Sequence, residues 1–551
     1  MRLRTSALLV LALAAAAAQA SRGVHTPRVV LSNCSSTGTQ STIAIDGVWE
    51  SVTNDTAGVF GSNGNATVAA FHGIPYALPP TGPRRFRAST PLRCPEATRG
   101  SAFNATSSKT VCPQWGSPPQ GNWDFTQSED CLLLHVFTPM RALAASQSKL
   151  PVFVFIHGGD LTFGGGAQQT LGFWAANAAG RWAPPNSIDP SGGAVTVAIN
   201  YRLGVLGFLG AKELSATASD GVGANFGFTD SVAALEWVSA NIAAFGGDPT
   251  RVTVVGQSSG ATTIYGLMAS PRAVGLFANA IALSGSPNIT MDLPTKQKQD
   301  ASIVDALQCN STNDNASAVV ACLQAKPWAD IVAATPSSWG LPRLPELKAT
   351  RPSASGIGLI GICAVDGAVV TSPLSRALVS GVSPCATDST WCVANRHRWG
   401  SEQHQRALVM SHMGQEFNIA PAPLPLLNGM LRNSSEWHVF LRKQLLPGWG
   451  VDAASMADYL DTAFAPNVTF ALLEYTTITA SYGVACPYRL LASGAAVNRT
   501  SAPTLLAPPP TIFLLENEWQ PELPDNGGWQ SFAYHMWDWL PAPLPTPPFA
   551  F

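Results

Sequence analysis

The chain contains 551 residues, of which 46% are hydrophobic and 12% are charged, and its formal net charge at pH 7 is -2. This balance excludes the extended basic surface that nucleic-acid binding requires, and the sequence has no polyanionic tail. The hydrophobic fraction is ample for one large core. We therefore expect a globular protein whose partners are small molecules rather than nucleic acids.

The first twenty residues have the order of a secretory signal peptide. Arg2 and Arg4 precede an apolar run that ends in the small-x-small pattern Ala18-Gln19-Ala20. An uncleaved anchor is the alternative, but the run is short for a membrane span, and no later segment has about 18 uninterrupted apolar residues. We predict cleavage after Ala20, secretion, and a mature chain without a transmembrane segment.

Cysteines and glycosylation sequons also indicate an oxidising compartment. The ten cysteines are compatible with disulfides. Ten Asn-X-Ser/Thr sequons point the same way, and we expect several of them to be glycosylated. The sequon asparagines are Asn33, Asn54, Asn65, Asn104, Asn288, Asn310, Asn315, Asn433, Asn467 and Asn498.

Four apolar runs predict strands that are buried on both faces, as in a central parallel sheet. The runs are LPVFVFIHGG (150–159), AVTVAINYR (194–202), VTVVGQSSG (252–260) and PTIFLLEN (510–517). Between the second and third runs, residues 229–249 predict a helix that is stopped by two glycines and a proline. Strand, helix and strand in this order form the crossover unit of a parallel sheet, so the predicted fold class is α/β.

Two further stretches complete the predicted organisation. Residues 41–80 alternate in hydrophobicity and predict a small N-terminal sheet. Residues 290–480 are richer in helical and irregular sequence and predict a cap with gorge walls. Proline-rich pieces are typical of loops, and no clean linker is visible. We predict one domain over residues 21–551, with a mostly parallel sheet, flanking helices and cap insertions.

The stretch RVTVVGQSSGATTIYG (251–266) predicts a strand that bends sharply into a helix. In a G-x-S-x-G pattern, small residues at Gly256 and Gly260 let the central serine, Ser258, stand exposed at the bend. A five-residue pattern also arises by chance in a chain rich in glycine and serine. Its interpretation therefore depends on the rest of the sequence.

A nucleophilic serine also needs a histidine base, an orienting carboxylate and N–H donors for the oxyanion. Upstream of Ser258, a predicted central strand ends at His157-Gly158-Gly159-Asp160. Glycines at this point free backbone N–H groups to face a ligand, and an ordinary glycine turn is the alternative. A loop of this kind before the serine has the order expected of an α/β-hydrolase.

Five ordered blocks extend the pattern beyond the serine. They are FHGIPYALPPTGPRRFR (71–87), SEDCLLLHVFTP (128–139), NYRLGVLGF (200–208), NFGFTDSVAALEWVSANIAAFGGDPTRVTVVGQSSG (225–260) and CAVDGAVV (363–370). From about residue 45 to its end, the chain resembles the type-B carboxylesterase and cholinesterase family. The resemblance implies an α/β-hydrolase fold and hydrolysis of carboxylic esters, and it implies no metal and no cofactor.

The same resemblance implies a catalytic triad and an oxyanion hole. Ser258 is the expected nucleophile, Glu416 in LVMSHMGQEFN is the expected acid, and His535 in AYHMWDWLP is the expected base. The expected oxyanion donors are the backbone N–H groups of Gly159, Asp160 and Ser259.

Other titratable residues offer alternatives for two of these roles. Only His438 and His535 follow Glu416, and the surrounding EWHVFLRKQLL favours a helix-surface position for His438. Asp366 and Glu474 also lie between the expected nucleophile and base, so they are the alternative acids.

The resemblance further implies two disulfides, Cys112 with Cys131 and Cys309 with Cys322. Each would contribute about 3 kcal/mol if loop entropy dominates. The pairing of the other cysteines stays open. These are Cys34, Cys94, Cys363, Cys385, Cys392 and Cys486.

Several features depart from the family pattern. Asp160 replaces a small residue of the glycine loop, and its carboxylate would oppose an oxyanion unless it points away. Gln257 stands where many relatives carry glutamate, and Trp123 does not match the position of the cation-binding tryptophan of cholinesterases. The chain also ends soon after His535, where the family normally continues with helices that support the histidine loop.

The sequence thus predicts a secreted, glycosylated serine hydrolase that cleaves small-molecule carboxylic esters through an acyl-enzyme. One alternative is a catalytically inactive family member with a binding or structural role. Another is a lipase or cholinesterase with the same triad. Retention of Ser258, Glu416 and His535 argues against the inactive alternative, and the sequence specifies neither the acyl pocket nor the oligomeric state.

Overall fold

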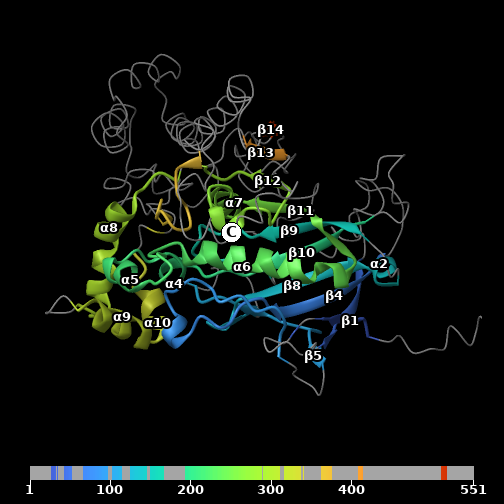
Figure 1. Cartoon of the computed structure of the whole chain (residues 1–551), viewed down its shortest axis with the longest axis horizontal. Coiled ribbons are helices and arrows are strands. Elements are labelled where there is room, and N and C mark those ends of the chain that lie inside the picture. Colours follow the sequence, from blue (N-terminus) through green and yellow to red (C-terminus); the bar gives the residue numbers. More distant parts are fainter. Residues whose placement is uncertain are drawn as a thin grey trace, which may run out of the picture.

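The computed structural model describes most of the first 374 residues and two later strands (Figure 1). The described residues are 26–32, 34, 42–52, 66–96, 102–114, 125–144, 149–166, 193–287, 289–310, 315–336, 339, 362–374, 407–413 and 511–517.

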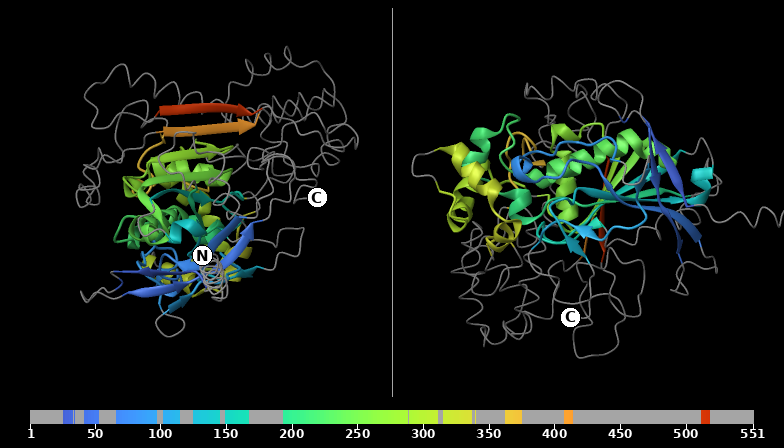
Figure 2. Two further views of the ribbon diagram at one scale, coloured as in Figure 1. Left: turned by 90° about the vertical axis from the view of Figure 1, so that its right-hand side faces the viewer. Right: turned by 90° about the horizontal axis from the view of Figure 1, so that it is seen from below.

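The main element of the described part is a nine-stranded sheet with the strand order β14-β13-β12-β11-β9-β10-β8-β4-β3. Figure 2 shows the N-terminal strands at one edge and the orange and red strands β13 and β14 at the other. The strands are β3 (Val48–Val52), β4 (Ala66–Pro75), β8 (Leu133–Pro139), β9 (Leu150–Ile156), β10 (Val195–Ile199), β11 (Gly247–Gln257), β12 (Asn279–Leu283), β13 (Ala407–Met413) and β14 (Thr511–Asn517).

The sheet is mixed but mostly parallel. The strands from β14 to β10 run parallel to one another, whereas β8 runs antiparallel to both β10 and β4, and β3 runs antiparallel to β4. All four predicted apolar runs are strands of this sheet, namely β9, β10, β11 and β14. The prediction of an α/β architecture with a mostly parallel sheet agrees with this arrangement.

The predicted crossover helix is present, but its bounds differ from the prediction. Helix α6 spans Phe226–Asn241 and lies across the sheet (Figure 1). It is followed by the 3-10 turn η3 (Ile242–Phe245), which ends at Gly246 with φ 84°. The helix begins three residues before the predicted stretch, at Phe226, whereas the predicted stop at the two glycines is confirmed. Gly246 ends the helical turn, and the strand β11 begins at Gly247.

The prediction of a small N-terminal sheet over residues 41–80 was only partly correct. A separate three-stranded sheet contains β1 (Arg28–Leu31), β2 (Ile43–Asp46) and β5 (Ala102–Asn104). Strands β3 and β4 instead extend the main sheet. Gly47 separates β2 from β3, and a Cβ there would lie 2.5 Å from the carbonyl oxygen of Ala70. Alternating hydrophobicity specifies which face of a strand is buried but not which neighbour it pairs with.

Shorter helices gather beyond the carboxyl ends of the parallel strands, at the end of the sheet opposite α2 (Figure 1). Helices α8 (Leu293–Ala306), α9 (Ala316–Ala325) and α10 (Trp328–Ala333) agree with the helical character predicted for the region after residue 290. Most of that region lies outside the described residues. None of the described helices combines the length and hydropathy that a membrane crossing requires. The remaining elements are β6 (Thr110–Val111), β7 (Thr126–Gln127), α2 (Met140–Ala144), α4 (Gly204–Phe208), α5 (Lys212–Thr217), α8 (Leu293–Ala306), α9 (Ala316–Ala325), α10 (Trp328–Ala333), η1 (Gly82–Arg84) and η4 (Pro271–Ala273).

Three disulfides occur within the described part of the chain. Two of them are the pairs that the family resemblance implies, Cys112–Cys131 and Cys309–Cys322. The third joins Cys34 to Cys94 and thereby ties the N-terminal sheet to the segment that follows β4. Disulfides of this number are compatible with an oxidising compartment.

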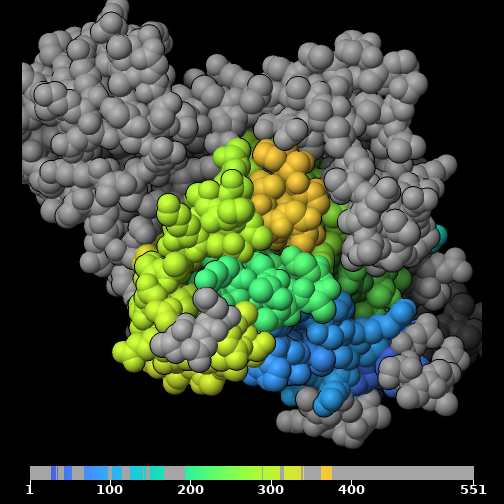
Figure 3. Space-filling view, turned by 60° about the vertical axis from the view of Figure 1, so that its left-hand side comes forward, coloured from blue at the N-terminus to red at the C-terminus, as the bar shows by residue number. Residues whose placement is uncertain are grey.

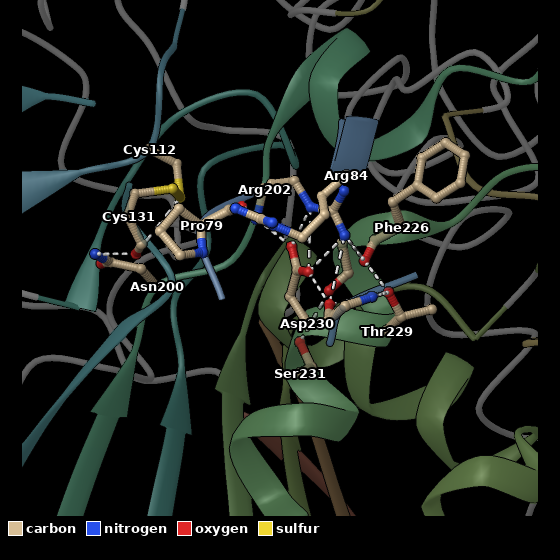
Figure 4. Close-up of polar contacts among 12 residues, drawn as sticks. Pro79, Arg84, Cys112, Cys131, Asn200, Arg202, Phe226, Thr229, Asp230 and Ser231 are labelled. Carbon is tan, nitrogen blue, oxygen red and sulfur yellow. Dashed lines mark hydrogen bonds and ion pairs between the residues drawn. A yellow bond between two sulfur atoms is a disulfide. The ribbon is translucent and has the colours of Figure 1, made fainter. Parts of the chain in front are cut away.

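A buried ion pair attaches the end of β10 to helix α6 (Figure 4). The Arg202 guanidinium donates to Asp230 through Nε, 2.8 Å from Oδ2, and through Nη2, 2.7 Å from Oδ1. The backbone N–H of Arg202 also donates to Asp230 Oδ2 at 2.9 Å, and the Ser89 hydroxyl donates to Oδ1. Because both side chains are buried, each charge depends on the other for compensation.

We expect Asp230→Ala to lower the free energy of unfolding by about 3–5 kcal/mol, because it leaves the buried Arg202 charge without its counterion. Chemical denaturation of the purified protein measures this change. Asp46→Ala is a matched control, since Asp46 pairs with Arg28 at the surface, where the Arg28 side chain is 57% exposed. Water and ions screen such a pair, so Asp46→Ala should lower the free energy of unfolding much less than Asp230→Ala does. Equal losses in the two variants would contradict the assigned importance of the buried pair.

A second buried polar contact links β4 to β8. His135 is buried, and its Nδ1 lies 3.2 Å from Nδ1 of His72, whose Nε2 lies 2.7 Å from Glu50 Oε1. Burial, with a smaller contribution from His72, lowers the pKa of His135 to about 3. His135 is therefore neutral in the folded protein at neutral pH.

This pKa shift predicts acid lability with a defined sign. An unfolded histidine binds a proton near pH 6.5 and folded His135 only near pH 3, so this residue stabilises the fold above pH 6.5. The unfolding free energy therefore falls as pH drops from 6.5 toward 3, because the unfolded chain gains a proton in this range that folded His135 does not. We expect His135→Leu to make the decline of unfolding free energy shallower over this range. Parallel profiles for wild type and variant, measured by denaturation at several pH values, would contradict the prediction.

Candidate functional site

Ser258 lies where strand β11 turns into helix α7 (Ser259–Met268). Its backbone has φ 56° and ψ −126°, a conformation that is costly for a residue with a side chain. The Ser258 N–H donates to the carbonyl oxygen of Leu283 on β12 at 2.8 Å, which fixes the turn to the sheet. The side chain is half-buried rather than enclosed. The predicted strand-to-helix bend is therefore present, with Ser258 at its apex.

Two glycines make this bend possible by allowing close backbone contacts. A Cβ at Gly256 would lie 2.5 Å from the carbonyl oxygen of Gly260, and a Cβ at Gly260 would lie 2.1 Å from the carbonyl oxygen of Ile156. No side chain fits at either position. The start of helix α7 can therefore rest directly on the end of β9, which is the strand that leads into the predicted oxyanion loop.

The loop that follows β9 has an unusual backbone. Gly159, Asp160 and Leu161 have φ values of 109°, 60° and 57°. The carbonyl oxygen of Gly159 accepts from the N–H groups of Thr162 and Phe163, both at 2.9 Å, which closes the turn. An ordinary glycine turn after a strand, the alternative interpretation, does not require the positive φ that the non-glycine residues Asp160 and Leu161 also have.

The loop lies against the bend that carries Ser258. A Cβ added to Gly158 would lie 2.8 Å from the carbonyl oxygen of Gln257 and 3.1 Å from Ser258 Cβ. The structure thus brings Gly158, which directly precedes the predicted oxyanion residues Gly159 and Asp160, next to the predicted nucleophile.

The N-terminus of α7 supplies the third predicted donor. The carbonyl oxygen of Ser258 accepts from the N–H groups of Ala261 and Thr262 at 2.9 and 3.1 Å. The N–H of Ser259 precedes these and has no intrahelical acceptor. It is therefore available, beside Ser258, for a developing negative charge, which the helix dipole also favours.

Asp160, which departs from the family pattern, is buried and lies near Tyr201. The pKa of Tyr201 is raised chiefly by burial, and the negative charge of Asp160 raises it further. The Tyr201 hydroxyl donates to the carbonyl oxygen of His157 at 2.8 Å, on the buried side of the loop. The charge of the buried Asp160 is thus felt by Tyr201, which contacts the start of the loop.

His157 is a buried neutral residue under the loop. Its ring stacks on Tyr201 with centroids 4.4 Å apart and planes 21° from parallel. Its Nδ1 lies 2.7 Å from the carbonyl oxygen of Gly158, and burial lowers its pKa to about 4. Sequence reasoning identified His157 as part of the loop but did not identify Tyr201, although the NYR block directly after a central strand was a usable signal.

Asp366, one of the alternative acids, caps its own turn. Its Oδ1 accepts from three successive backbone N–H groups at 2.8–3.1 Å, those of Ala368, Val369 and Val370. Its pKa is raised by burial. These contacts give the carboxylate a local structural role.

The segment that contains Asp366 is attached to the far end of α7 from Ser258. The backbone N–H of Thr371 donates to the carbonyl oxygen of Ala269 at 3.4 Å, and Arg272 Nε donates to that of Ala368 at 3.3 Å. Figure 3 shows part of the segment 362–374, in orange, at the surface. Since the ten residues of α7 span about 15 Å, this position disfavours Asp366 as the partner of a base beside Ser258.

The other predicted residues lie outside the described part of the chain: Glu416, His535, Glu474, His438 and Trp123. The strands that precede the first two are nevertheless described. One row of partners crosses the sheet through Gln257, Leu283, Ser411 and Leu515. The chain therefore leaves β13 and β14 at the carboxyl ends of the parallel strands, the same side of the sheet as Ser258. Strand β13 ends at Met413, shortly before Glu416 in the sequence.

Within the described stretches, no cluster of three or more histidine, cysteine or acidic side chains has a metal-binding arrangement.

Comparisons with known proteins place the chain among esterases. A model of the carboxylesterase family matches residues 54–377. The chain is 38% identical over 281 residues to human cocaine esterase, covering 49% of this chain and 45% of the relative. It is 37% identical to para-nitrobenzyl esterase of Bacillus subtilis (44% and 45% covered) and 36% identical to mouse acylcarnitine hydrolase (49% and 45% covered).

The match therefore spans less than half the length of these curated relatives. The family model, in contrast, matches more than half of this chain, and its range includes the glycine loop and the bend at Ser258. The family resemblance of the sequence is confirmed, and the chain belongs to the carboxylesterase family.

Proposed function

We propose that this protein is a serine hydrolase that cleaves carboxylic esters of small molecules through an acyl-enzyme, in a single α/β-hydrolase domain with cap insertions. The observation that carries the proposal is the contact between the strained bend at Ser258 and the glycine loop at Gly158. A nucleophile next to N–H donors is the arrangement that acyl transfer requires.

The proposed mechanism assigns one role to each residue. Ser258 Oγ attacks the ester carbonyl while His535 takes its proton, and Glu416 orients the imidazole. The N–H groups of Gly159, Asp160 and Ser259 stabilise the oxyanion of the tetrahedral intermediate. His535 then protonates the departing alcohol and activates a water molecule, which releases the acid from Ser258.

The substrate class and location are also parts of the proposal. Relatives named cocaine esterase, para-nitrobenzyl esterase and acylcarnitine hydrolase support small organic esters as substrates. The mechanism uses no metal or cofactor. The three disulfides support an oxidising compartment, and together with the N-terminal sequence they favour secretion.

Fluorophosphonate labelling of the full glycoprotein tests the proposal without a choice of substrate. We expect the wild-type protein to be labelled at Ser258, as mapped by mass spectrometry of the modified peptide, because an activated serine attacks the reagent. Ser258→Ala should abolish labelling and reduce hydrolysis of a p-nitrophenyl ester by about 10⁴-fold or more. A folded wild-type protein that is not labelled would instead support a binding or structural role.

A second set of variants tests the acid and the base. We expect His535→Ala and Glu416→Gln each to lower kcat by about 10³-fold or more, because the base and its orientation are lost. The matched variants His438→Ala and Glu474→Gln should leave kcat within about twofold of wild type. A large loss in Glu474→Gln, with activity retained in Glu416→Gln, would reassign the acid.

A further inference from the structure

We infer that the side-chain hydroxyl of Ser259 is a positioning group that, with Tyr201, holds the oxyanion loop in place against Ser258. The inference rests on the function proposed above and adds a role to a residue considered so far only for its backbone N–H. Both side chains are buried, Ser259 at the first position of α7 and Tyr201 two residues after the end of β10.

One end of the loop is attached to Ser259 directly. The backbone N–H of Leu161 donates to Ser259 Oγ at 3.0 Å. Leu161 has φ 57°, which is costly for a leucine unless the surroundings hold it. The hydrogen bond connects the loop to helix α7, and the loop cannot rise from the helix without breaking it.

The other end of the loop is attached through Tyr201. The Tyr201 hydroxyl donates to the carbonyl oxygen of His157 at 2.8 Å. The same hydroxyl is hydrogen-bonded to the side chains of Ser259 and Thr263. Since the tyrosine proton is already donated, Ser259 donates its proton to the tyrosine oxygen. A continuous chain of hydrogen bonds thus runs from Leu161 through Ser259 and Tyr201 to His157.

This chain spans the two proposed oxyanion donors in the loop. Gly159 and Asp160 lie between His157 and Leu161, so the two attachments determine where their N–H groups point. Oxyanion donors act only within about 2.7–3.1 Å of the charge, and a displacement of about 1 Å costs roughly a hundredfold in rate. Alanine at position 259 would keep the backbone N–H but remove the attachment.

The test compares Ser259→Ala with Ser231→Ala in the full secreted chain. Ser231 is an equally buried serine whose hydroxyl donates within α6, to the carbonyl oxygen of Gly227 at 3.3 Å. We expect Ser259→Ala to lower kcat for p-nitrophenyl acetate about 10- to 100-fold with KM within about twofold, because the transition state alone uses the oxyanion donors. A trifluoromethyl ketone forms an oxyanion on Ser258, so its binding to Ser259→Ala should weaken by the same factor as kcat falls. Ser231→Ala should leave all three quantities within about twofold.

Tyr201→Phe provides an independent second variant. It keeps the ring stacked on His157 and removes only the hydroxyl, so we expect a similar loss of kcat. The double variant with Ser259→Ala should lose no more than the larger single effect, because both changes break one chain. This variant decides the question if Ser259→Ala unfolds below the assay temperature.

The outcomes separate the two proposals. If wild type reacts with fluorophosphonate and both Ser259→Ala and Tyr201→Phe behave like Ser231→Ala, the positioning role is wrong and the proposed function stands. If folded wild type does not react, the proposed function is wrong and the positioning role falls with it.

Discussion

The close contact between strands β9 and β11 is the constraint on which the candidate site depends. The two strands are parallel neighbours in which Ile156 pairs with Gly256, so the segments that leave them emerge side by side at one sheet edge. Parallel neighbours lie only about 4.8 Å apart, which leaves no room for side chains between the two exits. Glycine at positions 158 and 260 meets this limit, since a Cβ at either would collide with the opposite backbone. The sheet register and these two glycines together create the contact between loop and serine.

Three consecutive residues after β10 connect this contact to the rest of the fold. The backbone carbonyl oxygen of Asn200 accepts a hydrogen bond from the Tyr76 hydroxyl. The side-chain amide of Asn200 donates to the carbonyl oxygens of Thr110 and Cys131. Tyr201 supports the loop after β9, and Arg202 forms the buried pair with α6. Each of these polar groups would be costly to bury alone. Placed in succession after a central strand, they hold the loop closed by the Cys112–Cys131 disulfide, the glycine loop after β9 and helix α6 in one relative arrangement.

The sequence was sufficient to predict the elements with strong local signals. Long apolar runs predicted β9, β10, β11 and β14, and the glycine spacing around Ser258 predicted the bend. Local pattern could not assign β3 and β4 to the main sheet, because pairing partners are chosen by contacts between residues distant in sequence. It also missed Tyr201: the NYR block marks a position just after a central strand, but local sequence does not distinguish a tyrosine that supports a loop from any other aromatic core residue. The roles of Glu416 as acid and His535 as base stay predictions. They are supported by the position of β13 and β14, whose carboxyl ends lie on the same side of the sheet as Ser258.

Asp160 illustrates how a departure from a family pattern acquires meaning only from backbone geometry. In sequence, a carboxylate beside an oxyanion opposes the charge that the site must stabilise. In the structure, Asp160 is buried with φ 60°, and its negative charge contributes to the raised pKa of the buried Tyr201. Aspartate tolerates this left-handed conformation better than most residues because its short polar side chain makes local contacts. The residue can therefore occupy a left-handed position of the loop that glycine would also tolerate.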